Sequence, residues 1–273
     1  MSHDLRTPLN GVIGFTNLAL QETDLEKKQD YLKKINSSAG LLLDLVNDTL
    51  ELSRIESGKA VLNEEAVNEK DLVPAVVASL RPAAELKQIK IQTDYSMMEG
   101  KVFWCDKLKV EKIALNLLSN AIKYTPEGGT ISLGFIKGPE DMPACQWSMY
   151  IEDNGIGMSK AFLKHMFEPF SQEKRAEARK TQGTGLGLSI VKKYVDLMNG
   201  RIEVKSTLHK GTRWVISLPI TCVAEAETRR KKTKKKEANL VNKRVLLCED
   251  NDMNTEIAKM ILQEKGILCD TAA

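Results

Sequence analysis

Three alternating glycines stand directly before an apolar segment in the second half of the chain. They are Gly183, Gly185 and Gly187, with Thr184 and Leu186 between them. Glycine lets the main chain approach an anion closely, while the first turn of a following helix offers free N–H groups and the positive end of the helix dipole. The segment therefore predicts a phosphate-binding loop, although a glycine cluster fits an ordinary turn equally well.

An acidic residue followed by two glycines is a second candidate site. Asp153, Gly155 and Gly157 come directly after an expected β-strand that ends at Glu152. A carboxylate at the end of a strand can accept a hydrogen bond from the amino group of adenine, and the glycines leave room for that flat ring. Taken by itself, the segment fits an Asn-Gly hairpin turn better. The phosphate-type loop is the reason to favour a nucleotide pocket.

Amide side chains form a stripe along an expected helix at residues 106–124. Asn116, Asn120 and Lys123 are four and three residues apart, so they share one helix face. Neutral amide oxygens suit a Mg²⁺ ion that keeps some waters and phosphate ligands, and a lysine suits a phosphate oxygen. A solvent-facing stripe would more often carry Glu and Lys than Asn, which has poor helix propensity. Together the three segments indicate a site for Mg²⁺ and ATP.

These candidate residues lie within a mixed α/β region between about residues 60 and 221. Short β-type runs alternate there with helical runs, a pattern that predicts a sheet covered by helices, an α/β sandwich. The expected strands are 89–95, 130–136, 146–152, 201–205 and 212–218, and the expected helices are 106–124 and 186–198.

From Ser2 to about Ile55 the pattern is helical, with a joint near Thr23 and Asp24. Apolar residues in the second helix recur at alternating steps of three and four, which predicts an antiparallel hairpin. Such a hairpin cannot enclose a core alone, so we expect it to pair with a second copy in a four-helix bundle. Packing onto the neighbouring domain is the alternative. The stripe consists of Leu32, Ile35, Ala39, Leu42, Val46 and Thr49.

The composition limits the class of protein. The 273 residues are 42% hydrophobic and 28% charged, which is enough for about two folded domains. No run approaches the ~18 apolar residues of a membrane helix. We therefore expect a cytoplasmic location for this chain, while a longer parent protein could be anchored in a membrane.

Charge and cysteine usage exclude two further classes. The net charge is +3, but residues 229–236 hold seven positive charges, so the remainder of the chain is mildly acidic. This balance argues against a nucleic-acid-binding surface. The five cysteines are widely spaced and form no C-x-x-C pair, which argues against a disulfide framework or a zinc site.

The pattern divides the chain into four expected parts. They are a helical domain at 1–58, the α/β domain at 59–221, a basic linker at 222–242 and the start of a further unit at 243–273. No aromatic residue interleaves the basic run, so it reads as a solvated linker. The last part is expected to contain a strand, a helix and a second strand, and it is too short to fold alone.

Five segments in a fixed order carry a family resemblance. They are 2–9 (SHDLRTPL), 116–124, 153–157, 167–170 (FEPF) and 183–187. In this order they resemble the H, N, first glycine, F and second glycine boxes of the hybrid sensor histidine kinases. The resemblance implies a dimerisation and phosphotransfer domain, followed by the ATP-binding α/β sandwich shared with gyrase, MutL and heat-shock chaperone ATPases. Residues 245–251 resemble the opening of a flavodoxin-like receiver domain.

The resemblance assigns roles to residues of the helical domain and of the last part. His3 would be the phosphoacceptor, Asp4 would orient the imidazole ring and draw its proton, and Thr7 would help a water attack a phosphorylated partner. Glu249 and Asp250 would hold the Mg²⁺ of a receiver that is present only as an incomplete start.

ATP and Mg²⁺ are the cofactors that the resemblance implies. Asn116 and Asn120 would face the metal, and the polar segment from Ser171 to Gln182 would form a lid over the nucleotide. The expected nucleotide-binding residues are Asn116, Asn120, Lys123, Tyr124, Asp153, Gly155, Gly157, Gly183, Thr184, Gly185, Leu186 and Gly187.

The expected activity is ATP-dependent autophosphorylation on His3, with the phosphoryl group passed to a receiver aspartate outside this chain. The expected partners are a second copy of the chain and the receiver domain of a response regulator. Because the first helix begins two residues before His3, we expect the dimer to be weakened. Two alternatives remain: an ATP hydrolase or clamp of the wider ATPase fold, and a non-catalytic dimerisation scaffold.

Overall fold

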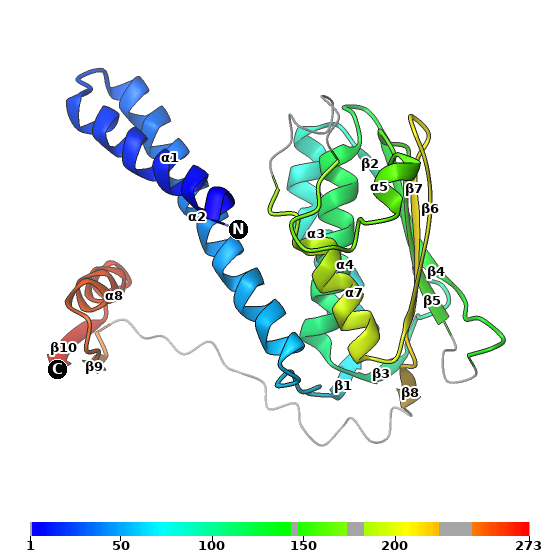
Figure 1. Cartoon of the computed structure of the whole chain (residues 1–273). Helices are drawn as coiled ribbons and strands as arrows, with labels where there is room; N and C mark the ends of the chain where they lie inside the picture. Colours follow the sequence, from blue (N-terminus) through cyan, green and yellow to red (C-terminus); the bar gives the residue numbers. More distant parts are fainter. Residues whose placement is uncertain (1, 143–146, 174–182, 224–241, 273) are drawn as a thin grey trace. The chain divides into compact units, whose positions relative to one another are not determined.

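The structure is a computed structural model that describes residues 2–142, 147–173, 183–223 and 242–272 (Figure 1). For residues 2–4 it describes the backbone alone. Contacts within the chain divide it into two units, residues 1–228 and residues 229–273.

A helical hairpin opens the first unit, as the sequence predicts. Helix α1 (Ser2–Gln21) continues through Pro8, and helix α2 (Leu25–Glu56) returns along it (Figure 1). The carboxylate of Asp24 caps α2 by accepting hydrogen bonds from the backbone amides of Glu26 and Lys27 at 2.9 and 3.3 Å.

A five-stranded sheet forms the centre of the α/β domain, with the strand order β2-β4-β5-β7-β6. Strands β2 and β4 are parallel and the other neighbours are antiparallel. All five strands fall within two residues of the predicted runs. Their bounds are β2 (Lys90–Asp94), β4 (Thr130–Lys137), β5 (Trp147–Asp153), β6 (Arg201–Thr207) and β7 (Gly211–Ser217).

Three helices cover one face of this sheet: α3 (Val73–Leu86), α4 (Lys107–Tyr124) and α7 (Gly187–Leu197) (Figure 1). Helices α4 and α7 match the predicted helices, and the buried carboxylate of Asp106 caps α4 by accepting a hydrogen bond from the Lys109 amide. Ile113 and Leu117 of α4 lie in the same hydrophobic core as the sheet residues Ile131 and Ile151, and all four side chains are fully buried. The α/β sandwich is confirmed.

Several elements were not predicted from the sequence. Helix α3 contains Pro82, and the strands β1 (Glu65–Asn68), β3 (Val102–Cys105) and β8 (Thr221–Val223) form a small antiparallel sheet. A 3₁₀ turn (Glu69–Asp71) and the short helix α5 (Lys160–Leu163) also belong to this domain. The Asn-Gly hairpin alternative is wrong, because the chain after Asp153 leads to α5 and β5 pairs with β4 and β7.

The second unit consists of strand β9 (Arg244–Cys248), helix α8 (Asp252–Glu264) and strand β10 (Leu268–Ala272). The two strands are parallel, with Leu268 opposite Arg244. Strand, helix and strand follow in the predicted order. Among the helices of the described ranges, none has the length and apolar character needed to cross a membrane.

The buried face of α4 generates a first prediction. Replacing Leu117, which is fully buried, with alanine should lower the free energy of unfolding by about 2–5 kcal/mol, because the lost side chain leaves a cavity in a close-packed core. Urea unfolding measures this change. The matched control is Leu108→Ala on the same helix, where the side chain is 74% exposed. The control should cost less than about 0.5 kcal/mol, and equal losses would contradict the packing described.

Candidate functional site

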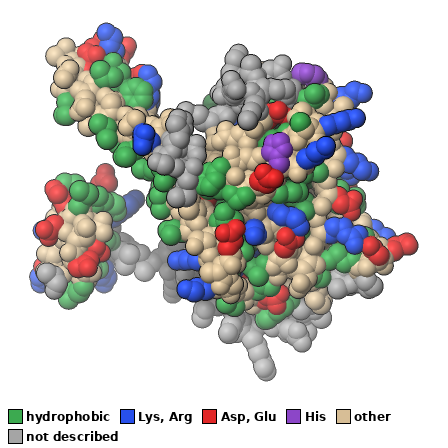
Figure 2. Space-filling model, viewed as in Figure 1, with side chains coloured by type: hydrophobic (Ala, Val, Ile, Leu, Met, Phe, Trp, Pro, Cys, Tyr) green, Lys and Arg blue, Asp and Glu red, His purple; other side chains and the backbone are tan. Residues whose placement is uncertain are grey.

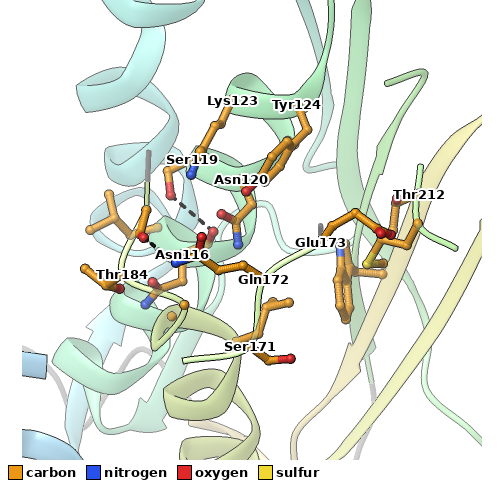
Figure 3. A pocket seen from close by; sticks show the side chains of 18 of the residues that line it. Asn116, Ser119, Asn120, Lys123, Tyr124, Ser171, Gln172, Glu173, Thr184 and Thr212 are labelled. Carbon is orange, nitrogen blue, oxygen red and sulfur yellow. Dashed lines mark hydrogen bonds between the residues drawn. The ribbon is translucent and has the colours of Figure 1, made fainter. Parts of the chain in front are cut away.

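A cavity of about 500 Å³ lies between α4, the loop after β5 and the glycine segment before α7 (Figure 3). Its volume is within the usual range for small-molecule sites. Ten of the residues predicted to bind nucleotide line it: Asn116, Asn120, Lys123, Tyr124, Asp153, Gly157, Gly183, Thr184, Gly185 and Gly187.

The amide stripe of α4 faces this cavity (Figure 3). The Asn116 side chain donates a hydrogen bond from Nδ2 to the Lys112 carbonyl at 2.9 Å, which leaves its Oδ1 turned toward the start of α7. A Cβ atom on Gly187 would lie 2.6 Å from that Oδ1. Glycine at this position therefore lets the first turn of α7 approach the amide stripe closely.

Lys123 brings a positive charge to the inner end of the stripe. Burial lowers the pKa of its ammonium to about 8. The ammonium lies 4.9 Å from the centre of the Tyr124 ring, and no carboxylate pairs with it among the residues that the structure describes. A Cβ atom on Gly183 would collide with this ammonium, so the glycine keeps space beside it.

Asp153 at the end of β5 places a carboxylate on the cavity wall. Its side chain is 8% exposed, and its Oδ1 accepts a hydrogen bond from the Gly155 amide at 2.9 Å. Burial raises the pKa of this carboxyl to about 6, although hydrogen bonds from the Gly155 and Thr212 amides act in the opposite direction. The carboxylate thus changes its charge just below neutral pH.

Backbone geometry explains two of the glycines around the cavity. Gly157 has φ +61°, and a side chain there would collide with the carbonyl of Thr207. Gly185 has φ +72°, and a Cβ atom there would lie 2.8 Å from the backbone of Phe170. Both positions require the left-handed backbone that glycine adopts without strain.

Two predicted binding residues lie beside the cavity without lining it. Leu186 is fully buried in the hydrophobic core just before α7, and its amide donates a hydrogen bond to the Thr184 hydroxyl at 3.2 Å. Gly155 packs against the carbonyl of Tyr124, where a Cβ atom would come within 2.6 Å. Their contribution is to the shape of the two loops.

The structure does not bring every predicted residue to the cavity. His3, Asp4 and Thr7 lie on α1, and the side chains of His3 and Asp4 lie outside the described part of the chain. Among the α1 residues with described side chains, from Leu5 onward, none lines the cavity. Ser171, Gln172 and Glu173 line it, but residues 174–182 of the predicted lid lie outside the described residues.

Glu249 and Asp250 belong to the second unit. The Glu249 carboxylate accepts a hydrogen bond from Asn254 Nδ2 at 2.8 Å. Within the described ranges, no three His, Cys, Asp or Glu side chains gather where a metal ion could be held.

The sequence did not reveal that helix α2 also lines the cavity. Asp48 of α2 forms an ion pair with Lys112 of α4 at 3.0 Å, and Leu41 and Asp44 lie beside it on the cavity wall. Tyr194 of α7 donates a hydrogen bond to Glu51 of α2 at 2.7 Å. These contacts join segments far apart in the chain, so no local sequence pattern predicts them.

Thr212 and Trp214 of β7 were also missed. Thr212 lies opposite Asp153 in the register of β5 and β7, and both residues line the cavity. The signal that could have found Thr212 is the pairing of β5 with β7, which places a partner directly beside the carboxylate.

Two known families match most of this architecture. Residues 1–58 match the His Kinase A (phospho-acceptor) domain. Residues 105–221 match the family described as histidine kinase-, DNA gyrase B- and HSP90-like ATPases. This range includes all the residues of α4, β5 and α7 that line the cavity. The chain belongs to the sensor histidine kinases.

Curated histidine kinases align with nearly the whole chain. The sensor histidine kinase GacS of Pseudomonas protegens is 35% identical over 268 residues, which are 98% of this chain and 28% of the relative. The autoinducer 2 sensor kinase/phosphatase LuxQ of Vibrio cholerae is 35% identical over 272 residues, 98% of this chain and 31% of the relative. The chain therefore spans less than a third of either relative.

A solved structure has the same fold. The crystal structure of full-length ShkA in complex with AMPPNP matches with a TM-score of 0.63 and 25% identity, over 100% of this chain and 54% of that one. The likeness covers both the helical hairpin and the α/β domain.

The cavity of this histidine kinase has the chemistry that an adenine nucleotide requires. Lys123 is a buried cation without a carboxylate partner among the described residues, which suits a phosphate group. Asp153 is a buried acceptor that also lines the cavity, which suits an amino group. The donor set and the volume therefore fit ATP.

The raised pKa of Asp153 generates a second prediction. Between about pH 4 and pH 6 the folded chain holds a proton on Asp153 that the unfolded chain has lost, since the ordinary pKa is 3.8 and the folded value is about 6. The contribution of this group to stability is therefore full below pH 4 and is lost as the pH rises to 6. Asp153→Asn should remove that loss and make the chain more stable than the wild type above pH 6, by up to roughly 3 kcal/mol.

Urea unfolding of both proteins at pH 4.5 and pH 7.5 measures the effect. The difference in unfolding free energy between variant and wild type should grow with pH. A difference that stays constant across this window would contradict the raised pKa.

Proposed function

We propose that this chain is the core of an ATP-dependent protein-histidine kinase that phosphorylates His3. The observation that carries the proposal is the cavity itself. It combines a buried cation, an amide stripe and a buried carboxylate, in a chain whose first 58 residues match a phospho-acceptor domain. The wider ATPase family accounts for the cavity but not for that helical domain.

The residues of the cavity would divide the work of binding ATP. Asp153, ionised above about pH 6, would accept a hydrogen bond from the adenine amino group. Lys123 would bind a phosphate oxygen, and the contact would raise its pKa back toward the ordinary value and keep it charged. The backbone around Gly183, Gly185 and Gly187 would approach the phosphates at the start of α7.

Mg²⁺ would be held by the side-chain oxygens of Asn116 and Asn120 together with phosphate oxygens and water. Bound there, it would offset the negative charge that moves between phosphate oxygens during transfer. Both amides line the cavity on the same face of α4.

The transfer to His3 follows from the chemistry of imidazole. One ring nitrogen attacks the γ-phosphorus with its lone pair, the bond from phosphorus to the bridging oxygen breaks, and ADP leaves with that electron pair. Asp4 holds the proton of the other ring nitrogen, which makes the attacking nitrogen a better nucleophile.

The phosphoryl group would then pass to a receiver aspartate outside this chain, on the receiver domain of a response regulator. Thr7 would assist the reverse process by orienting a water. The second unit would be the start of a receiver, in which Glu249 and Asp250 hold Mg²⁺ once the domain is complete. The parts would be the phosphotransfer domain 1–58, the ATP-binding domain 59–221, the linker 222–242 and the receiver start 243–273.

A second copy of the chain is the partner proposed for the hairpin. Hydrophobic side chains remain exposed along it (Figure 2), including Leu32 at 53% and Val46 at 41%. Both belong to the stripe that the sequence assigns to a four-helix bundle. Burying them against the same stripe of a second copy would remove this apolar surface from water.

Labelling with γ-labelled ATP tests the proposal. Incubation with Mg²⁺ should place label on the wild-type chain as a phosphoramidate, which is labile in acid and stable in alkali. His3→Gln should abolish this label, since the accepting nitrogen is gone. Asn120→Asp should reduce it roughly 100-fold or more, because the new charge repels phosphate where an amide is expected to face the metal.

Asn199→Asp is the matched control. Asn199 is exposed, follows α7 and does not line the cavity, and aspartate tolerates its backbone φ of +53°. The control should label like the wild type. Release of phosphate from ATP without any acid-labile label would identify an ATP hydrolase instead, and nucleotide binding without label or hydrolysis would identify a scaffold.

A further inference from the structure

The C-terminal end of α4 has an unusual set of hydrogen bonds. The last carbonyl groups of an α-helix have no partner within the helix and must find one elsewhere. At this end of α4 the partner is the ammonium of Lys87. Its Nζ donates hydrogen bonds to the carbonyls of Ile122 at 2.7 Å and Thr125 at 2.6 Å. A third hydrogen bond, at 3.2 Å, goes to the carbonyl of Lys123.

The remaining carbonyl in this group belongs to Tyr124, and it points to the cavity loop instead. It accepts a hydrogen bond from the Ile156 amide at 3.1 Å. Ile156 lines the cavity between Asp153 and Met158. An ammonium has three N–H donors and no acceptor. Lys87 therefore donates to three of the four carbonyls, and the Tyr124 carbonyl remains available to the Ile156 amide of the loop.

Lys87 is itself fixed from two sides. It is the C-cap residue of α3, and its own carbonyl accepts a hydrogen bond from the Gly128 amide at 3.0 Å. Both ends of the residue are therefore bound to the segment at 122–128 that follows the amide stripe. Its positive charge also lies at the negative end of the α4 dipole, where a cation is favoured.

We propose that Lys87 is a positioning residue for nucleotide binding: by holding the last turn of α4, it sets the places of Lys123, Tyr124 and, through the Tyr124 carbonyl, Ile156. This inference rests on the proposed function of the cavity as an ATP site. Lys87 does not line the cavity, so it acts through the helix end and not on the ligand.

The physical effect of losing the ammonium follows from these contacts. Three partly buried carbonyls would lose their donors, and the last turn of α4 would compete for other partners, including water and the Ile156 amide. Lys123 and Tyr124 project from that turn into the cavity. The side chains of Lys123 and Tyr124 would then occupy a wider range of positions, and the affinity for a ligand that contacts both side chains would fall.

Variants of the full chain separate positioning from simple loss of stability. Lys87→Met keeps the length of the side chain and removes its donors, and Lys87→Arg restores donors and charge. The matched control is Lys101→Met, since Lys101 Nζ donates to the Met97 carbonyl at 2.6 Å and lies 4.3 Å from the centre of the Trp147 ring. Lys101 neither lines the cavity nor touches α4's last carbonyls.

Two measurements decide the question. Calorimetry gives the Kd of a non-hydrolysable ATP analogue with Mg²⁺, and hydrogen exchange compares the Ile156 amide with the Ile151 amide in the core of β5. Lys87→Met should weaken binding at least about tenfold and accelerate exchange at Ile156 but not at Ile151. Lys87→Arg should recover most of the affinity, and Lys101→Met should bind as the wild type does.

Other outcomes would overturn the inference. It fails if Lys87→Met binds nucleotide like the wild type, or if Lys101→Met with an equal loss of stability binds equally weakly. It also fails if exchange at Ile156 rises no more than at Ile151. A wild-type chain that binds no adenine nucleotide overturns the proposed function as well, and the wild-type measurement thus distinguishes the two failures.

Discussion

Helix α4 has to satisfy two opposite environments along its length, and the α/β domain is arranged around that requirement. Ile113 and Leu117 need a dry sheet beneath them, while Asn116 and Asn120 need polar surroundings on the adjacent face. A rotation of the helix by one residue would bury an amide and expose a core leucine, which costs free energy on both faces. The sheet, α3 and α7 enclose the apolar face, and the cavity is what remains open on the polar one.

The same arrangement removes charged groups from water before any ligand arrives. Burial moves the pKa of Lys123 down and that of Asp153 up, so each group is held closer to its neutral form than it would be in solution. Side chains kept in this condition do not stabilise the fold, and they concentrate at functional sites for that reason. Hydrogen bonds from the Gly155 and Thr212 amides to Asp153 offset part of the cost.

Local patterns in the sequence were sufficient to predict α4 and the five strands of the main sheet. An element that buries one face carries apolar residues at a regular spacing, and that spacing is visible in the sequence. Helix α3 was not predicted, because the two prolines Pro74 and Pro82 disfavour a helix. Pro74 lies in the first turn, where proline is compatible with a helix, and Pro82 lies within the helix. Strands β1, β3 and β8 have only three or four residues each and find their partners far along the chain. Which glycines and amides would line one cavity could be inferred from motif order, but the contribution of Asp48 depends on packing between distant helices, which spacing does not encode.

Helix α2 contacts the ATPase domain through charged and polar groups, at Asp48 with Lys112, Glu51 with Tyr194 and Glu56 with Lys193. The first of these pairs also forms part of the cavity wall. The position of helix α2 and the binding of a ligand in the cavity are therefore thermodynamically linked. If moving α2 changes the affinity for the occupant, then the occupant must shift the position of α2 by the same free energy, so each influences the other.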